Sequence, residues 1–328
     1  MELESRVESI KTDYARIKNE LRKKIVGNDE VIEGILTCLL CNGHALLEGP
    51  PGLGKTSIIK SLGEALHLRF SRIQFTPDLM PADIIGTRIV MESEQGGRRF
   101  FQFHEGPVFA NIILADEINR ATPKTQSALL EAMQEGKVTV GRDDMKLPQP
   151  FLVLATQNPI EMEGTYPLPE AQLDRFFFKL IMPSPSKDEL MEIVDKTTSG
   201  EQPEIEPVMT EAHILELQKL VRMVPVSHEV KQYALRLVMA THAEAADAID
   251  QTKKYVRYGA SPRALQSIVL AAKTRALFQG RVSVSFDDVR KVTAPCMRHR
   301  IILNFEGEAE GITTEHMMGF LLASVQPE

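Results

Sequence analysis

Long hydrophobic runs are absent from this chain of 328 residues, and cysteine is scarce. The longest apolar stretches, such as residues 112–115 and 151–155, have the length of strands, whereas a membrane-spanning helix needs about 20 apolar residues. The first 20 residues are rich in charge where a secretion signal needs an apolar segment. Three cysteines without such a signal fit a reducing compartment. We therefore expect a cytoplasmic protein with no membrane span.

The cysteines also give little support for a redox or zinc site. Cys38 and Cys41 form a CxxC pair, but the third cysteine, Cys296, is remote and no second CxxC occurs in the sequence. The pair lies within the apolar run 35–41, which favours a packing role.

Excess positive charge is lacking as well. The formal net charge of −7 argues against a protein that coats nucleic acid, although it leaves room for a local basic channel. Hydrophobic residues make up 43% of the chain and charged residues 25%, close to the values of soluble globular proteins. The chain is long enough for one large domain or two ordinary ones, each with a buried core.

Short apolar segments alternate with helical ones in the first half. Helical periodicity covers residues 55–66 and 123–134. The expected strands are residues 44–48, 69–75, 111–115, 151–155 and 176–181. This alternation predicts an α/β fold with a mostly parallel sheet covered on both faces. Residues 88–103 and 136–150 interrupt it and read as two inserted hairpins that project from the core.

The character of the sequence changes near residue 183. Stretches rich in Pro, Ser and acidic residues bracket one short helix, as in a linker, and helical periodicity without a convincing strand follows residue 209. The clearest helix there has Ser261 as N-cap, Pro262 at the first helical position and Gly280 just past its end. We predict an α/β nucleotide-binding core over residues 1–185, a linker over 186–209 and an all-helical lid over 210–328.

A glycine-rich loop sits between the first expected strand and the helix after it. Residues 49–56, GPPGLGKT, match the pattern G-x-x-x-x-G-K-[ST]. Lys55 would be disfavoured at the positive end of a helix dipole unless an anion joins it. Backbone N–H groups at Gly52 and Gly54 can face phosphates, with Lys55 on the outer ones and the Thr56 hydroxyl on magnesium. The loop therefore predicts a nucleoside triphosphate site.

Polar side chains follow two further strands of the expected sheet. Asp116 and Glu117 come directly after one of them, and a magnesium ion held through Asp116 would relieve the repulsion between the two carboxylates. Glu117 is then free to polarise a water molecule for attack on the γ-phosphate. Asn158 follows the next strand, where it either orients that water or belongs to an Asn-Pro turn.

Two arginines complete the set of candidates. Arg263 lies on the first turn of the helix that Ser261 caps, so it too places a cation at a positive dipole end, which one bound triphosphate would explain. Arg175 precedes the last expected strand. On local grounds it is a solvated side chain or a partner of Asp174.

These segments together resemble the MoxR-type AAA+ ATPases of the helix-2-insert branch, over nearly the whole chain. The resemblance rests on the quoted loop and on segments such as ADEINRA, FLVLATQNP, LPEAQLDRF and YGASPRA. It implies a P-loop NTPase that uses ATP and Mg²⁺, with Thr56 and Asp116 as metal ligands, Glu117 and Asn158 at the reacting phosphate, and Arg263 as the second sensor. The residues expected around the nucleotide are Val26, Gly27, Gly49, Pro50, Pro51, Gly52, Leu53, Gly54, Lys55, Thr56, Ser57 and Asp116.

The resemblance also changes the interpretation of Arg175. In similar proteins the arginine of the DRF segment reaches the nucleotide of the next subunit, which implies a homo-hexameric ring. It further implies a chaperone-like motor that remodels or activates partner proteins, often ones with a von Willebrand factor A domain, and magnesium chelatase suggests metal insertion as a variant. Two alternatives stay open: a nucleic-acid-dependent motor, against which the acidic net charge speaks, and a nucleotide-gated scaffold that barely hydrolyses ATP.

Overall fold

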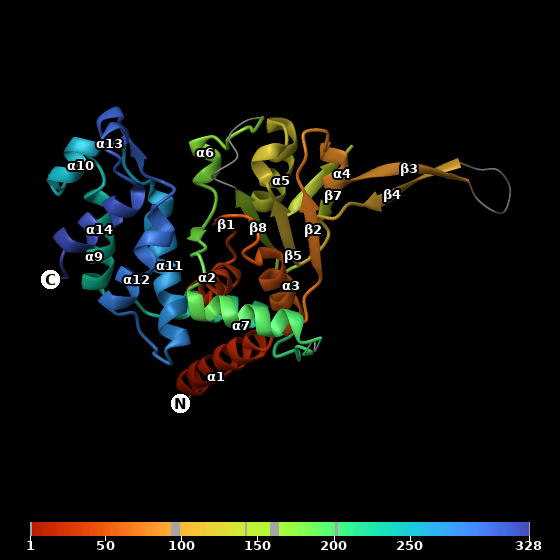
Figure 1. The fold of residues 1–328 in the computed structure, drawn as a ribbon, viewed down its shortest axis with the longest axis horizontal. Coiled ribbons are helices and arrows are strands. Elements are labelled where there is room, and N and C mark those ends of the chain that lie inside the picture. Colours follow the sequence, from red (N-terminus) through yellow and green to blue (C-terminus); the bar gives the residue numbers. More distant parts are fainter. Residues whose placement is uncertain (1, 93–98, 142, 158–163, 201–202, 328) are drawn as a thin grey trace.

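The computed structural model describes residues 2–92, 99–141, 143–157, 164–200 and 203–327. Its centre is a five-stranded parallel sheet in the order β2-β5-β8-β1-β9, with helices on both faces and a helical domain beyond the β9 edge (Figure 1). The strands of this sheet are β1 (Ala45–Glu48), β2 (Phe70–Gln74), β5 (Ile112–Asp116), β8 (Leu152–Gln157) and β9 (Phe178–Ile181). All five expected strands are confirmed.

The sheet is buried on both faces because successive side chains alternate between two apolar cores. Leu47, Ile112 and Leu154 belong to the larger core, which extends into the lid. Leu46 and Ile113 belong to the smaller core on the opposite face. Near-continuous apolar strands are therefore required, and this is why the sequence signal was clear.

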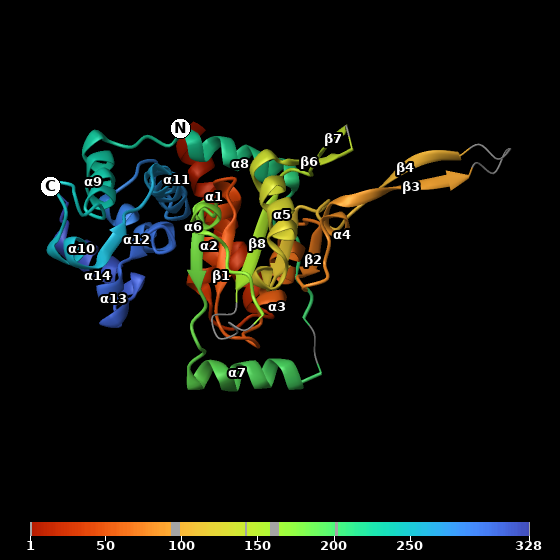
Figure 2. The same cartoon turned by 90° about the horizontal axis from the view of Figure 1, so that it is seen from above.

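The described residues of the core segment contain seven further helical elements. They are α1 (Glu2–Arg22), α2 (Asp29–Leu40), α3 (Lys55–Ala65), α4 (Pro81–Ile85), the 3-10 turn η1 (Ile118–Arg120), α5 (Pro123–Glu135) and α6 (Glu170–Leu173). Helix α7 (Lys187–Thr198) has no buried residue and lies across the carboxyl ends of the strands (Figure 2).

The C-terminal domain is helical, as expected, but it also contains a short antiparallel ribbon. The ribbon pairs β10 (Val256–Tyr258) with β11 (Ile302–Leu303), which are too short to give a periodic signal in the sequence. The helices here are α8 (Glu211–Met223), α9 (His228–Met239), α10 (Asp250–Tyr255), α11 (Pro262–Phe278), α12 (Phe286–Met297), α13 (Phe305–Ala309) and α14 (Thr314–Ser324). No helix in the described ranges is long and apolar enough to cross a membrane.

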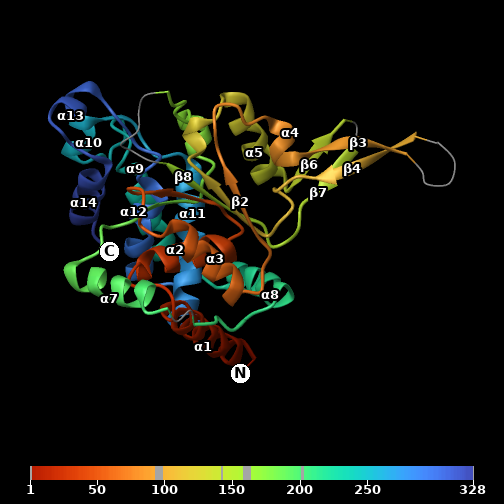
Figure 3. The same ribbon diagram turned by 45° about the vertical axis from the view of Figure 1, so that its right-hand side comes forward.

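Both expected hairpins are present. The longer, β3 (Gly86–Glu92) with β4 (Arg99–Glu105), extends far from the body, and β6 (Lys137–Val140) with β7 (Asp143–Lys146) lies near its base (Figure 3). Arg88 forms an ion pair with Asp143, which ties the two hairpins together. The turn of the longer hairpin lies outside the described residues.

The strand register separates the chain's candidate residues into two groups. β1 and β9 run parallel from the pair Ala45–Phe178 to the pair Glu48–Ile181. The phosphate loop follows Glu48 at the carboxyl edge of the sheet, whereas Arg175 precedes β9 at the amino edge. At about 3.3 Å per residue the paired segment alone spans about 10 Å. Figure 2 shows α6 near one edge and α7 across the other.

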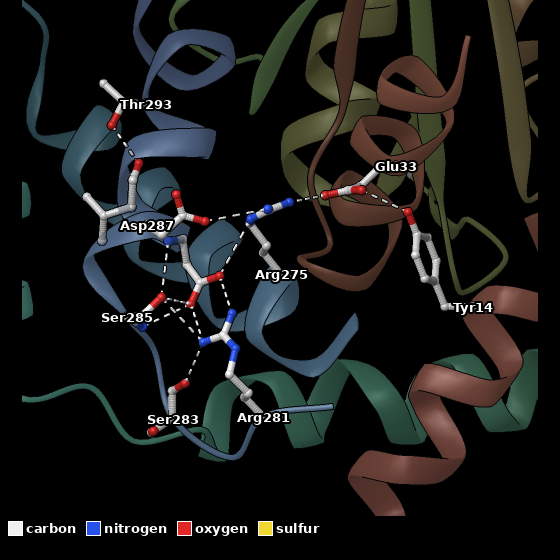
Figure 4. A network of polar contacts seen from close by, with 10 residues as sticks. Tyr14, Glu33, Arg275, Arg281, Ser283, Ser285, Asp287 and Thr293 are labelled. Atoms are coloured by element: carbon white, nitrogen blue, oxygen red, sulfur yellow. Dashed lines mark hydrogen bonds and ion pairs between the residues drawn. The ribbon is translucent and has the colours of Figure 1, made fainter. Parts of the chain in front are cut away.

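A polar network fastens the lid to the core (Figure 4). Arg275 of α11 donates through Nη1 to Glu33 Oε1 of α2 at 2.7 Å, and the Tyr14 hydroxyl of α1 donates to Glu33 Oε2 at 2.8 Å. On the lid side Arg281 makes two hydrogen bonds to Asp288, whose side chain is fully buried. Three elements of the core and lid thus meet at Glu33.

Candidate active site

The phosphate loop has the backbone that the sequence requires. Gly52 and Gly54 adopt φ values of 83° and 75°, which a residue with a Cβ rarely adopts, and no atom of the described residues lies within 4 Å of the position a Cβ would take at either glycine. The loop leads into α3, whose first turn carries no acidic side chain. Backbone N–H groups and open space at the start of a helix suit a phosphate group.

Lys55 lies on this first turn, where its ammonium donates to the Gly49 carbonyl. Partial burial lowers the pKa of Lys55, and the negative charges of Asp116, Glu117 and Glu48 oppose that shift. The lysine therefore shares an electrostatic environment with both acidic residues that follow β5. The structure brings these three predicted residues together at the carboxyl edge.

Asp116 ends β5 with both carboxylate oxygens engaged. Its Oδ1 accepts from the Thr156 hydroxyl at 2.7 Å, and its Oδ2 accepts from Arg72 Nη2 at 2.6 Å. A cation thus already sits against this carboxylate. The donor set, a carboxylate at the strand end and the Thr56 hydroxyl at the loop, fits the oxygen ligands that Mg²⁺ prefers.

Glu117 is held in an unusual backbone conformation. Its φ of 57° is in the left-handed region, which non-glycine residues seldom adopt and which often marks a functional site. Its backbone N–H donates to the Thr156 hydroxyl at 2.8 Å. Its side chain accepts from Gln74 at 2.8 Å and from Arg120 at 2.9 Å through the same oxygen, Oε2. These contacts fix the carboxylate directly beside Asp116.

The remaining residues that were predicted to surround the nucleotide or to act on it are located as follows. Val26 is buried, and Gly27, with a φ of 63°, lies against the side chain of Glu189 at the start of α7. Ser57 is exposed on the outer face of α3. Asn158 lies outside the described residues. Pro50 and Pro51 lie in the loop between Gly49 and Gly52, and Leu53 lies between Gly52 and Gly54.

Arg175 and Arg263 lie together at the amino edge, away from Lys55. Arg263 Nη1 is 3.2 Å from Asp174 Oδ2, and Asp174 directly precedes Arg175. The anion beside the first turn of α11 is therefore Asp174. Arg175 is exposed, and within the described part of the chain its side chain makes no hydrogen bond or ion pair.

Sequence reasoning missed three polar residues of these two clusters. Arg72 and Gln74 were predicted only as part of the strand 69–75, with no role in the site. Gln74 is the last residue of its strand, at the same edge as Asp116, so its position was a usable signal. The sequence suggested Asp174 only as a partner of Arg175. Its contacts with the lid could not be foreseen, because they join residues about 90 or more positions apart.

Comparison with known proteins agrees with this architecture. The profile of the ATPase family associated with various cellular activities (AAA) matches residues 44–178, and that of the AAA lid domain matches residues 250–318. The sheet, the phosphate loop, the two carboxylates and the helical lid therefore define an AAA ATPase. Such a protein binds nucleotide.

More specific relatives cover almost the whole chain. Chaperone MoxR1 of Mycobacterium tuberculosis is 44% identical over 93% of this chain and 80% of its own length, and protein MoxR of Paracoccus denitrificans is 31% identical over 85% and 86%. A crystal structure from Cytophaga hutchinsonii, described provisionally as an ATPase, superimposes with a TM-score of 0.92 at 40% identity over 99% of this chain and 98% of its own. The chain belongs to the MoxR family of AAA ATPases.

Proposed function

We propose that this protein hydrolyses ATP at sites shared between adjacent copies of the chain. The observation that carries the proposal is the separation of the two charged clusters on opposite edges of one sheet. Lys55, Asp116 and Glu117 form an acidic and phosphate-binding half, and Arg175 with Arg263 forms a basic half. The basic half cannot serve its own phosphate loop from that edge, so a neighbouring copy would complete each site.

In this mechanism each residue has a defined task. Lys55 and the loop amides bind the phosphates, and Thr56 and Asp116 would hold Mg²⁺. Held by these residues, Mg²⁺ would supply charge neutralisation for the phosphates. Glu117 orients the attacking water, with Asn158 as its partner at the γ-phosphate. Arg175 and Arg263 of the neighbour stabilise the charge that spreads over the transferred phosphoryl group.

Mixing two inactive variants tests the shared site. Lys55→Ala lacks a phosphate-binding half and Arg175→Ala lacks a basic half, so each alone should be inactive. In an equal, random mixture about a quarter of the interfaces pair an intact phosphate loop with an intact arginine, and about a quarter of the wild-type rate should return. An affinity tag on one variant alone, with recovery of the untagged variant alongside it, reports co-assembly. A co-assembled mixture that stays inactive would contradict sharing.

We further propose that hydrolysis drives remodelling or activation of a partner protein, with a homo-hexameric ring as the working assembly. Support comes from the similarity to a protein named as a chaperone and from the long hairpin. Val90 and Phe101 are opposite each other on this hairpin and are 55% and 71% exposed, so they form a contiguous apolar surface of the kind that contacts partner proteins.

Capture with a stalled variant tests this second proposal. Glu117→Gln should bind ATP without hydrolysing it and retain its partner longer than wild type. Lys55→Ala, which should not bind ATP, is the matched control. Proteins with a von Willebrand factor A domain are the expected class of partner. Recovery of nucleic acid alone from the ATP-loaded variant would exclude the chaperone role.

A further inference from the structure

Asp174 is the meeting point of three lid side chains at the amino edge of the sheet. Its Oδ1 accepts from the Ser261 hydroxyl at 2.6 Å and from Arg300 Nε at 2.9 Å, and its Oδ2 accepts from Arg263 at 3.2 Å. Arg300 also donates to the Asp174 backbone carbonyl at 3.2 Å. The turn that carries Arg175 is therefore fixed to the helix that carries Arg263.

The two arginines that bind Asp174, Arg300 and Arg263, differ in the exposure of their side chains and in the number of other groups to which they donate. Arg300 has a side chain only 2% exposed and donates to several core carbonyls, among them Phe176 at 2.7 Å. Arg263 is 49% exposed, and in the described residues Asp174 is the one group to which it is shown bonded. Arg300 is thus a permanent structural contact, whereas Arg263 is free to contact a further anion from outside.

Ser261 adds a second observation. It occupies the N-cap position of α11, yet no side-chain hydrogen bond caps the helix, because its hydroxyl is directed to Asp174. The first turn of α11 carries no acidic residue of its own. The Asp174 carboxylate consequently supplies the negative charge that the helix N-terminus favours.

Charge at this edge exceeds what Asp174 can neutralise. Arg263 and Arg300 share its single negative charge, and Arg175, the next residue, has no partner among the described side chains. Three guanidinium groups thus face one carboxylate, and the excess positive charge is exposed at Arg175 and Arg263. Such a cluster suits a highly charged anion, and a triphosphate is one.

We propose that Asp174 is a positioning residue that sets Arg175 and Arg263 at a fixed separation, so that both contact the nucleotide of an adjoining copy. This inference rests on the proposed shared ATPase site. The Asp174 carboxylate thereby couples the position of Arg175, in the core, to that of Arg263, in the lid. Without it, both arginines remain in the chain but lose their common geometry.

The variant Asp174→Asn tests this with the folded chain and ATP. It keeps hydrogen-bond acceptance from Arg300 but removes the charge that holds Arg263. We expect kcat to fall about 10- to 100-fold, as misplacement of catalytic groups by about 1 Å does. KM for ATP and the affinity for a fluorescent ATP analogue should stay within about twofold, because the variant's own phosphate loop is intact. Glu170→Gln, an equal charge change one helical turn earlier on α6, should behave as wild type.

Subunit mixing separates positioning from a general structural defect. Asp174→Asn mixed with Lys55→Ala should recover activity, because the Lys55→Ala copy supplies correctly placed arginines. A defect within the variant's own nucleotide site would not be rescued. Ser261→Ala, which removes one contact without uncovering a charge, should lower kcat by about two- to fivefold.

The outcomes distinguish the positioning role of Asp174 from the proposed shared ATPase site on which it rests. If wild type hydrolyses ATP and Arg175→Ala is rescued by mixing while Asp174→Asn has wild-type kcat, the positioning role is wrong and the shared site stands. If Asp174→Asn is inactive and mixing fails although circular dichroism shows a folded protein, the role is equally wrong. If Arg175→Ala itself hydrolyses at the wild-type rate, the shared site fails.

Discussion

The two ends of helix α11 are attached to the α/β core by different polar contacts. Near its C-terminus Arg275 binds Glu33, which is also bonded to Tyr14; Tyr14 is buried, and Arg275 and Glu33 are partly buried. At its N-terminus Arg263 binds Asp174 and is half exposed. At the Glu33 end the charge of Arg275 is paired within the molecule, whereas the Asp174 end leaves positive charge exposed.

This difference indicates two separate tasks for one helix. A polar cluster whose charges are paired within the molecule contributes to stability. A cluster with surplus charge contributes little to stability at an exposed site but can bind an incoming anion. We therefore expect the Glu33 end to hold the lid in place and the Asp174 end to serve catalysis.

Removal of Arg263 should give the largest effect. Because it contacts the transferred phosphoryl group in the proposed mechanism, Arg263→Ala should lower kcat by about 10³-fold. The free energy of unfolding should change by no more than about 0.5 kcal/mol, since the lost ion pair is half exposed. ATPase assays and urea unfolding measure the two quantities. A large loss of stability together with unchanged turnover would reverse the assignment of the two ends.

Replacement of Arg275 should give the opposite pattern. Arg275→Met keeps the apolar stem but leaves Glu33 without its cation, and we expect the free energy of unfolding to fall by about 2 kcal/mol. The turnover of the folded fraction should remain at the wild-type value. Lys254→Met, which removes an exposed ion pair with Glu310 elsewhere in the lid, is the control and should unfold like wild type.

Much of this fold could be predicted from the sequence because its core strands are apolar on both faces. The five strands, both hairpins and the helix that begins at Pro262 were all predicted close to their actual bounds. The β10–β11 ribbon was missed because two or three residues carry no periodicity. The domain bounds at residues 185 and 210 stay a prediction, and α8, just past the second bound, packs against both α2 and α11.

The residues of the candidate site also fall into a group that the sequence predicted and a group whose placement it did not predict. The phosphate loop and the two carboxylates could be found because neighbours in the sequence carry that chemistry. The opposite placement of Lys55 and Arg263 could not be read from sequence, because it depends on how the lid docks beside β9. The same docking brings Ser261, Arg263 and Arg300 to Asp174. Long-range packing, which local patterns do not encode, therefore decides which residues share a site.

The smallest effect is expected at Tyr14. Tyr14→Phe removes the hydrogen bond to Glu33 but keeps the ring stacked on Phe278 at a centroid distance of 4.2 Å, so the free energy of unfolding should fall by about 1 kcal/mol. Urea unfolding at several pH values measures this difference, with Tyr258→Phe, at an exposed ring on β10, as the control.

The pH dependence of that difference follows from the environment of the phenol. Burial, aided by the nearby Glu33 carboxylate, raises the pKa of Tyr14 well above its ordinary value, so the hydroxyl stays protonated in the folded protein. The stabilisation should be constant below about pH 9 and should shrink as the pH rises past about 10, where tyrosine ionises in the unfolded chain. A difference that instead grew with pH would mean that Tyr14 ionises in the folded state. The Glu33 end of α11 would then not be the internally paired, purely structural contact described above.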